Sequence, residues 1–202
     1  MKNITAKTIQ YYERNADGYV YETMNCDFTD IEKRFCKYIK PGGNILDVGC
    51  GSGRDAKYFI EKGYQVTAFD GSEVMSRRAS QYLGMSVDTV LIQDYSFQEQ
   101  YDGIWCCASL LHLTLSEIQI FLLKAEKFLK KDGVVYVSFK YGTRQEIRDG
   151  RYYTDLTEKS LEKVVSKLHE LEVIEMFRSD DVLRDRKQQW LNAILKKVDD
   201  KH

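Results

Sequence analysis

Three glycines and one aspartate form the part of this chain best suited to chemistry. Asp47 stands two positions before Gly49, and further glycines follow at positions 51 and 53, in a segment typical of a buried strand, a turn and a helix start. Glycine lets a ligand approach the backbone closely, and the first turn of a helix offers free N–H groups. Arg54 occupies the last glycine position of the dinucleotide-binding pattern G-x-G-x-x-G. A carboxylate at the strand end suits instead a ligand that carries an ammonium group.

Two further apolar runs also end in an acid. Residues 65–70 end in Asp70, 21 positions after Gly49, and residues 90–94 end in Asp94. An acid after the second strand of a nucleotide-binding fold accepts hydrogen bonds from ribose hydroxyls, and Asp94 is expected to accept one from an adenine amino group. S-adenosylmethionine combines adenosine with ammonium, sulfonium and carboxylate groups. The three acids therefore predict this cofactor.

The loop, the acids and their spacing resemble the class I S-adenosylmethionine-dependent methyltransferases. The resemblance rests on specific motifs over residues 43–140 and extends more loosely to the whole chain. It implies that Asp47 lies near the methionine amino group and that Asp70 holds the ribose. It also implies that Gln93 and Asp94 flank the adenine. The remaining cofactor-binding residues that it implies are Gly49, Cys50, Gly51 and Gly53 in the loop, Gly71 after the second strand, and Ala108 and Ser109 after the fourth.

Arg54 and Asp55 are an unusual start for the helix that follows the loop. The pair is similar to that of a branch of small bacterial methyltransferases that includes the tellurite-resistance-type enzymes. Arg54 is a candidate for orienting the methionine carboxylate of the cofactor. Alternatively, it packs its stem along the sheet and pairs with Asp55 or Asp47. The sequence leaves both interpretations open.

The residues that would serve the methyl acceptor lie after the later strands and near the N-terminus. Methyl transfer from a sulfonium is an in-line displacement, so the acceptor must be aligned behind the methyl group and water excluded. His112 follows the fourth strand and is a candidate base or orienting residue, with a structural histidine as the alternative. Tyr12 and Tyr19 stand in a segment that folds over the cofactor in similar enzymes, with ordinary aromatic packing as the alternative. The candidates for recognising an anionic or aromatic acceptor are Lys140, Tyr141, Arg151 and Tyr152, followed by Arg148, Tyr153, Arg184, Arg186 and Trp190; a solvated loop is the alternative for each.

Apolar periodicity and turn residues predict alternating strands and helices up to residue 140. The expected helices span 27–39 with Asp27 as N-cap, 54–62, 72–84 with a Ser72 cap, 114–132 with a Thr114 capping box, and a segment capped by Thr157. The expected strands span 44–48, 65–70, 90–94, 101–107, 133–139, 171–177 and 190–195. This order predicts an α/β fold with a doubly wound, mostly parallel sheet and helices on both faces. The resemblance adds that the sheet has seven strands, one of them antiparallel near the C-terminus.

One domain over residues 1–202 is expected. It comprises a helical lid over 1–40, a cofactor-binding core over 43–140, and a substrate-side connection with a terminal strand pair over 141–202. Thirty Lys and Arg against 31 Asp and Glu give a formal net charge of −1, so no global field attracts nucleic acid or an anionic membrane. A local basic patch would still allow nucleic acid as a partner. The sequence does not determine the oligomeric state.

The sequence does not fit a membrane protein, a secreted protein or a metal-binding protein. No apolar run approaches the ~20 residues that span a bilayer, and the N-terminus lacks an apolar signal segment, which favours a cytoplasmic location. Five cysteines without a C-x-x-C pair argue against a disulfide framework or a structural zinc site. Buried, reduced cysteines and no metal site are therefore expected.

The sequence thus favours a methyltransferase that uses S-adenosylmethionine and acts on a small molecule. No separate target-recognition domain fits the length, and the D/N-P-P-Y motif of amino-group nucleic-acid methyltransferases is absent. One alternative is a tRNA- or protein-modifying methyltransferase with partner contacts on the face formed by residues 140–151. Another is a non-catalytic module that binds the cofactor and serves in an interaction. A NAD-dependent oxidoreductase fits least well, because Arg54 replaces a required glycine.

Overall fold

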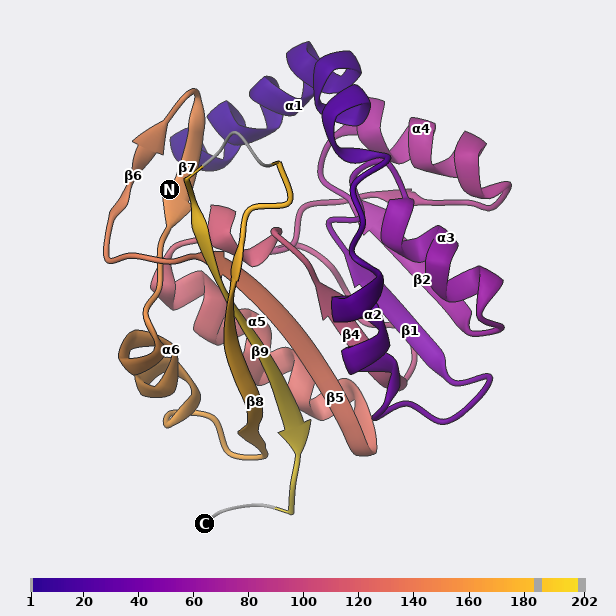
Figure 1. The fold of residues 1–202 in the computed structure, drawn as a ribbon, viewed down its shortest axis with the longest axis vertical. Coiled ribbons are helices and arrows are strands. Elements are labelled where there is room, and N and C mark those ends of the chain that lie inside the picture. Colours follow the sequence, from indigo (N-terminus) through magenta and orange to yellow (C-terminus); the bar gives the residue numbers. More distant parts are fainter. Residues whose placement is uncertain (1, 184–186, 200–202) are drawn as a thin grey trace.

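A seven-stranded sheet in the order β3-β2-β1-β4-β5-β9-β8 forms the centre of the molecule (Figure 1). The computed structural model describes residues 2–183 and 187–199. The sheet contains β1 (Asn44–Val48), β2 (Gln65–Asp70), β3 (Asp88–Thr89), β4 (Tyr101–Cys106), β5 (Leu129–Lys140), β8 (Leu171–Asp180) and β9 (Gln189–Lys197). The helices are α1 (Lys2–Thr23), α2 (Thr29–Cys36), α3 (Arg54–Glu61), α4 (Glu73–Leu83), α5 (Leu115–Phe128) and α6 (Glu158–Val165).

The predicted fold class is confirmed. The strands β1 to β5 pair in parallel, whereas β9 runs antiparallel to both of its neighbours, β5 and β8. The order reverses between β1 and β4, so the carboxyl ends of these strands border a crevice at the switch point. Ligands of open α/β sheets bind in such a crevice, and in this chain it is the place where the glycine loop follows β1.

Helices cover both faces of the sheet and bury its apolar side chains (Figure 1). On one face, α5 and α6 pack against alternate residues of β4, β5 and β9. On the other face, α2 and α3 pack an aromatic cluster against the sheet, in which Trp105 stacks on Tyr136 at 4.0 Å between ring centroids and contacts Phe35 and Phe59. Residues of β4 are buried on both sides, as expected for a central parallel strand. This two-sided core holds the strand ends at fixed positions.

The predicted helix caps are present at three helix starts. Ser72 accepts a hydrogen bond from the Met75 N–H at the start of α4, and Thr114 and Thr157 form capping boxes at α5 and α6. Such caps satisfy backbone N–H groups that the first turn leaves free. They fix the positions at which α4 and α5 leave the carboxyl edge of the sheet.

The long helix α1 lies across the carboxyl edge of the sheet, and a hairpin lies beside it (Figure 1). The hairpin consists of β6 (Gln145–Arg148) and β7 (Arg151–Thr154), in a segment that the sequence predicted only as a connection. The Tyr152 N–H donates to the Thr8 hydroxyl at 3.0 Å, and the Thr154 hydroxyl donates to the Leu113 carbonyl at 2.6 Å. The N-terminal helix, the hairpin and the segment after β4 are thus tied together over the crevice.

Element boundaries differ from the prediction in three places. Strand β3 comprises only Asp88–Thr89, and residues 90–94 form the turn after it, because Leu91 and Ile92 line the crevice instead of extending the sheet. Asp27 does not cap α2, because Phe28 takes the N-cap position. The Asp27 carboxylate accepts the Thr29 N–H at 2.9 Å. The helix ends at Cys36, earlier than expected.

The third difference concerns the end of α5. The helix ends at Phe128 rather than at 132–133, and β5 begins at once. Pairing with β4 shifts between Tyr101↔Leu129 and Gly103↔Val134, so residues 130–133 bulge out of the strand. Asp132 takes a positive φ of 62° in this bulge, which makes the predicted turn lie inside the strand.

Candidate active site

The glycine loop after β1 has a backbone conformation that favours glycine. Gly49, Gly51 and Gly53 have φ values of 68°, 55° and 85°, a region that other residues enter at a cost. A Cβ on Gly49 would lie 2.8 Å from the Ser109 Cβ, so this position also needs glycine for close packing. The N–H groups of Gly49 and Cys50 donate to the Phe69 carbonyl at 3.0 Å. The loop is therefore fixed before any ligand binds.

Asp70 at the end of β2 connects the loop to α4. Its two carboxylate oxygens accept the N–H groups of Gly51 and Ser72, each at 2.8 Å. Burial raises the pKa of Asp70, and these two N–H groups oppose the increase. A carboxylate offers about four lone-pair directions, so both oxygens keep room for a further donor. Two adjacent hydroxyls of a ribose are suitable donors.

A cavity beside Asp70 has the shape and polarity expected for an adenosine. Leu91, Ile92 and Ile9 give it apolar walls, and Gly71 and Ser109 lie along its floor. A Cβ on Gly71 would lie 2.8 Å from the Ile9 Cδ1, so α1 closes directly over this position. The buried Ser109 Oγ has no hydrogen-bond partner within the described residues. The remaining lining residues are Thr5, Thr8, Tyr12, Tyr19, Gly49, Gly51, Asp70, Met75, Gln93, Cys107, Ala108, His112 and Leu113.

Asp47, just before the loop, is suited to bind a positively charged group. It is only 2% exposed, and its Oδ2 has no hydrogen-bond partner among the described residues. Burial raises the pKa of Asp47 well above its usual range, and the nearby Asp55 carboxylate raises it further. An ammonium group bound there would satisfy the free oxygen and favour the ionised acid. The two carboxylates, Asp47 and Asp70, thus suit the ammonium and the ribose hydroxyls of S-adenosylmethionine.

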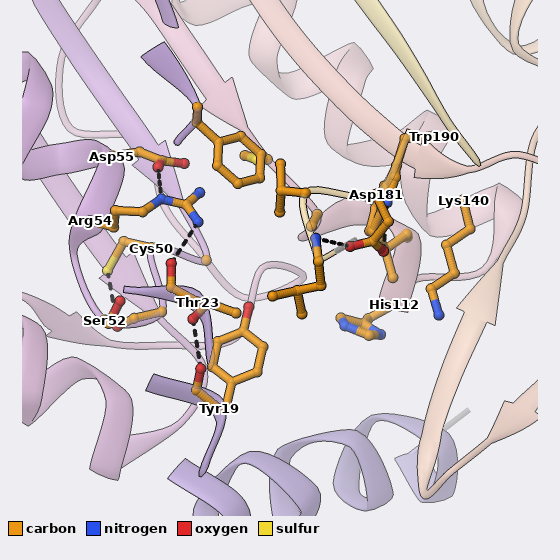
Figure 2. Close-up of a pocket in the computed structure, with 18 of the residues that line it drawn as sticks. Tyr19, Thr23, Cys50, Ser52, Arg54, Asp55, His112, Lys140, Asp181 and Trp190 are labelled. Carbon is orange, nitrogen blue, oxygen red and sulfur yellow. Dashed lines mark hydrogen bonds and ion pairs between the residues drawn. The ribbon is translucent and has the colours of Figure 1, made fainter. Parts of the chain in front are cut away.

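Arg54 forms a cluster with Asp55 and Thr23 (Figure 2). Its Nε donates to the Asp55 carboxylate at 2.6 Å, one of its terminal nitrogens donates to the Thr23 carbonyl at 3.2 Å, and the guanidinium lies 3.8 Å from the centre of the Phe28 ring. The pairing with Asp55 was one of the two interpretations of the sequence. The contacts of Arg54 with Thr23 and Phe28 hold α1 and the segment before α2 against the loop.

The acceptor side of the crevice contains a hydrogen-bonded pair of ring side chains. The His112 Nδ1 lies 2.7 Å from the Tyr152 carbonyl, which can only accept, so Nδ1 carries the proton. Its Nε2 therefore accepts from the Tyr12 hydroxyl at 2.9 Å. Burial and the positive charges of Arg151 and Lys140 lower the pKa of His112 to about 3, against the effect of the Tyr152 carbonyl. The imidazole is neutral at pH 7.

A second cavity extends from the loop past His112 toward the hairpin. Figure 2 shows Arg54 and Asp55 on one side of it and His112, Lys140 and Trp190 on the other. Its walls are largely aromatic, because Tyr12, Tyr19, Phe28, Tyr153 and Trp190 all line it. Asp181 also lines the cavity and accepts from the Trp190 Nε1 at 3.1 Å and from the Leu183 N–H at 2.9 Å.

The structure brings most of the sequence-derived candidates to these two cavities and leaves several outside. Asp94 is exposed and lines an adjoining cavity that shares Thr5, Ile9, Leu91 and Gln93 with the adenosine cavity, so its adenine contact stays a prediction. Gln93 lines both cavities and donates to Thr5 and Glu117. Tyr141 is half-buried against the core and lines neither cavity, and its hydroxyl accepts from Arg178. Tyr152 reaches the site only through its carbonyl. Arg148 pairs with Asp155, and Arg184 and Arg186 lie outside the described residues.

Sequence reasoning missed several lining residues. Thr8 and Ile9 of α1, Thr23, Phe28, Leu111 and Asp181 line the cavities, yet no motif marks them. They come from segments far apart in the chain, so only the packed fold brings them together. Within residues 2–183 and 187–199, no cluster of three or more His, Cys, Asp or Glu residues suits a metal ion. None of the described helices is long and apolar enough to cross a membrane.

Comparisons with known proteins agree with this site. Residues 45–133 match a methyltransferase domain family. An uncharacterized methyltransferase of Geobacillus sp. (strain WCH70) is 29% identical over 143 residues, which cover 66% of this chain and 65% of that protein. The chain spans between about two fifths and two thirds of the length of the curated relatives it matches most strongly.

Solved structures share the fold over nearly the whole chain. The 1,6-didemethyltoxoflavin-N1-methyltransferase of Burkholderia thailandensis superposes with a TM-score of 0.79 at 21% identity, covering 95% of this chain and 85% of that one. A TehB-like S-adenosylmethionine-dependent methyltransferase of Corynebacterium glutamicum gives a TM-score of 0.72 at 18% identity, covering 92% and 99%. The fold and the loop define a nucleotide-binding α/β domain. With the domain match over residues 45–133, the chain is similar to the class I S-adenosylmethionine-dependent methyltransferases, and its site suits S-adenosylmethionine.

Proposed function

We propose that this protein transfers a methyl group from S-adenosylmethionine to a small-molecule acceptor. The observation that carries the proposal is the junction of the two cavities. Gly49, Gly51, Cys107, Ala108 and His112 line both of them. A cofactor with its adenosine in the first cavity and its amino group at Asp47 in the second would therefore carry its methyl group at the junction. Binding in adjoining cavities is what an in-line displacement requires.

The chain's own residues would bind and orient both reactants. Asp70 and Asp47 would hold the ribose and the amino group, and the glycine loop would allow close approach of the backbone. When bound, S-adenosylmethionine supplies a methyl group on a positively charged sulfur. Helix α1 would exclude water, because Tyr12 and Tyr19 line both cavities from above the loop.

His112 would act as a positioning residue rather than a strong base. A pKa of about 3 makes its imidazole a weak proton acceptor. Its two ring nitrogens are already engaged, one by the Tyr152 carbonyl and one by the Tyr12 hydroxyl. We infer that His112 fixes the direction of the Tyr12 hydroxyl, which lines the acceptor cavity.

The lining of the acceptor cavity supports a small acceptor. Side chains of α1 and of the hairpin line it, together with Asp181 and Trp190. The crystal structure of the Burkholderia thailandensis enzyme holds 1,6-didemethyltoxoflavin together with S-adenosylhomocysteine. That protein therefore provides an example of this fold with a small molecule bound beside the cofactor product.

A transfer assay tests this proposal against its alternatives. The protein is incubated with methyl-labelled S-adenosylmethionine and a cell extract that has been separated into small-molecule, RNA and protein fractions. We expect label in the small-molecule fraction, and no transfer when Asp47 is replaced by Ala. Label in RNA or protein instead would favour a macromolecule-modifying enzyme. Tight cofactor binding without transfer to any fraction would favour a non-catalytic binding module.

A further inference from the structure

Two positive side chains from the hairpin side of the fold line the acceptor cavity. Lys140 ends β5, and its ammonium lies 4.0 Å from the centre of the Tyr153 ring. Arg151 begins β7, and its guanidinium lies 4.1 Å from the centre of the Tyr11 ring and 5.4 Å from that of Tyr153. Aromatic faces attract cations, so these rings hold both charges at the cavity wall.

Arg151 differs from its neighbour Arg148 in how its charge is balanced. Arg148 donates to both carboxylate oxygens of Asp155, which is 4% exposed. Arg151 pairs with no carboxylate in the part of the chain that the structure describes, and its Nε is buried without a hydrogen-bond acceptor. A partly buried guanidinium with a free donor is costly. A bound anion would remove that cost.

Among the described residues, the acids that line the cavity have partners other than Arg151, or lie at the cofactor loop as Asp47 does. Asp181 is engaged by the Trp190 indole and the Leu183 N–H. Asp55 is engaged by Arg54 and by the Trp105 indole, and both Asp55 and Arg54 lie on the opposite side of the cavity (Figure 2). The His112 imidazole is neutral at pH 7. The guanidinium of Arg151 is therefore not balanced by a carboxylate of the described residues.

We propose that Arg151 and Lys140 select an acceptor that is a small, planar anion, a carboxylate or a deprotonated heterocycle. This inference rests on the proposed function and names the class of its acceptor. Arg151 offers a planar fork of N–H groups that matches such an anion, and the aromatic walls favour a flat molecule. The negative charge also balances the sulfonium, which would otherwise share the cavity with two cations.

The chemistry of the transfer fits an anion. A lone pair of the acceptor forms the new bond to the methyl carbon, and the bond between this carbon and sulfur breaks with its electron pair going to sulfur. An acceptor atom that is already deprotonated releases no proton in this step. The weakly basic His112 is then sufficient, since no group needs to remove a proton.

Matched acid and amide probes test the charge requirement. The protein is saturated with S-adenosylhomocysteine and titrated calorimetrically with benzoate against benzamide and with picolinate against picolinamide. In at least one pair we expect the anion to bind roughly 10- to 150-fold more tightly, the range given by hydrogen bonds to a charged partner. Equal affinity within both pairs, or no binding of either anion, would overturn the proposal.

Variants identify the residues responsible. Arg151→Met should weaken anion binding at least tenfold and leave S-adenosylhomocysteine affinity within about threefold, whereas Arg151→Lys should recover part of the loss. Lys140→Met provides a second variant at a different strand. Arg144→Met removes the same charge from an exposed neighbour that pairs with Glu146 and should change neither affinity. Anion binding that survives both Arg151→Met and Lys140→Met would contradict the assignment. Absence of S-adenosylhomocysteine binding would instead show that the proposed function itself is wrong.

Discussion

Replacement of Asp70 is the most informative single change in the cofactor site. The carboxylate already accepts the N–H groups of Gly51 and Ser72 at 2.8 Å each, and it keeps a free lone-pair direction on each oxygen for the ribose. Loss of hydrogen bonds to a charged acceptor costs about 1.5–3 kcal/mol. Asp70→Ala should therefore weaken S-adenosylmethionine binding roughly 10- to 150-fold.

The same change should also destabilise the empty protein. Two buried N–H groups would lose their partner, which costs about 1–3 kcal/mol for each group that water does not reach. Calorimetric titration measures the affinity, and denaturant unfolding measures the stability. Asp88→Ala, at an exposed position on the neighbouring strand β3, removes an acid from the same edge and should change neither. If Asp70→Ala binds the cofactor with full affinity, the assignment of the ribose site is wrong.

Two other predictions concern buried titratable groups. His112→Ala should lower kcat more than tenfold while cofactor affinity changes less than threefold. Tyr12→Phe should reproduce most of this loss, because it removes the donor to the His112 Nε2. Equal losses of kcat and cofactor affinity would show that His112 is only structural. Burial and the nearby Asp55 raise the pKa of Glu32 from its ordinary value of 4.5 to about 8. The folded state therefore holds this proton more tightly than the unfolded chain, so stability is greatest below pH 4.5 for this group and falls as pH rises through 8. The decrease has an upper bound of about 5 kcal/mol. Glu32→Gln should remove it, and an unchanged pH profile of unfolding would contradict the account.

The cofactor side of the site could be predicted because it depends on local sequence. Gly49 and Gly53 must adopt positive φ, and Asp70 is the last residue of a strand, so spacing alone places these residues at one edge of the sheet. The strand predicted to end at Asp94 shows the limit of this reasoning. An apolar run suggested that this acid ends a strand, yet that strand stops at Thr89, and Asp94 lies exposed in the following turn.

The acceptor side could be predicted only in part, because it depends on tertiary packing. Tyr12 and His112 are 100 residues apart, and no spacing rule connects them. Asp181 enters the cavity because β8 ends beside the crevice. The hairpin formed by β6 and β7 was not predicted, although it decides that Arg151 faces the cavity while Tyr152 contributes only its carbonyl.

Calorimetric titration with S-adenosylmethionine, S-adenosylhomocysteine and NAD, in parallel on the purified protein, tests the central claim most directly. The account predicts micromolar binding of the first two and no binding of NAD, because Asp47 and Asp70 fit the two ends of S-adenosylmethionine and Arg54 occupies the start of α3. Binding of NAD alone, or of none of the three, would contradict it.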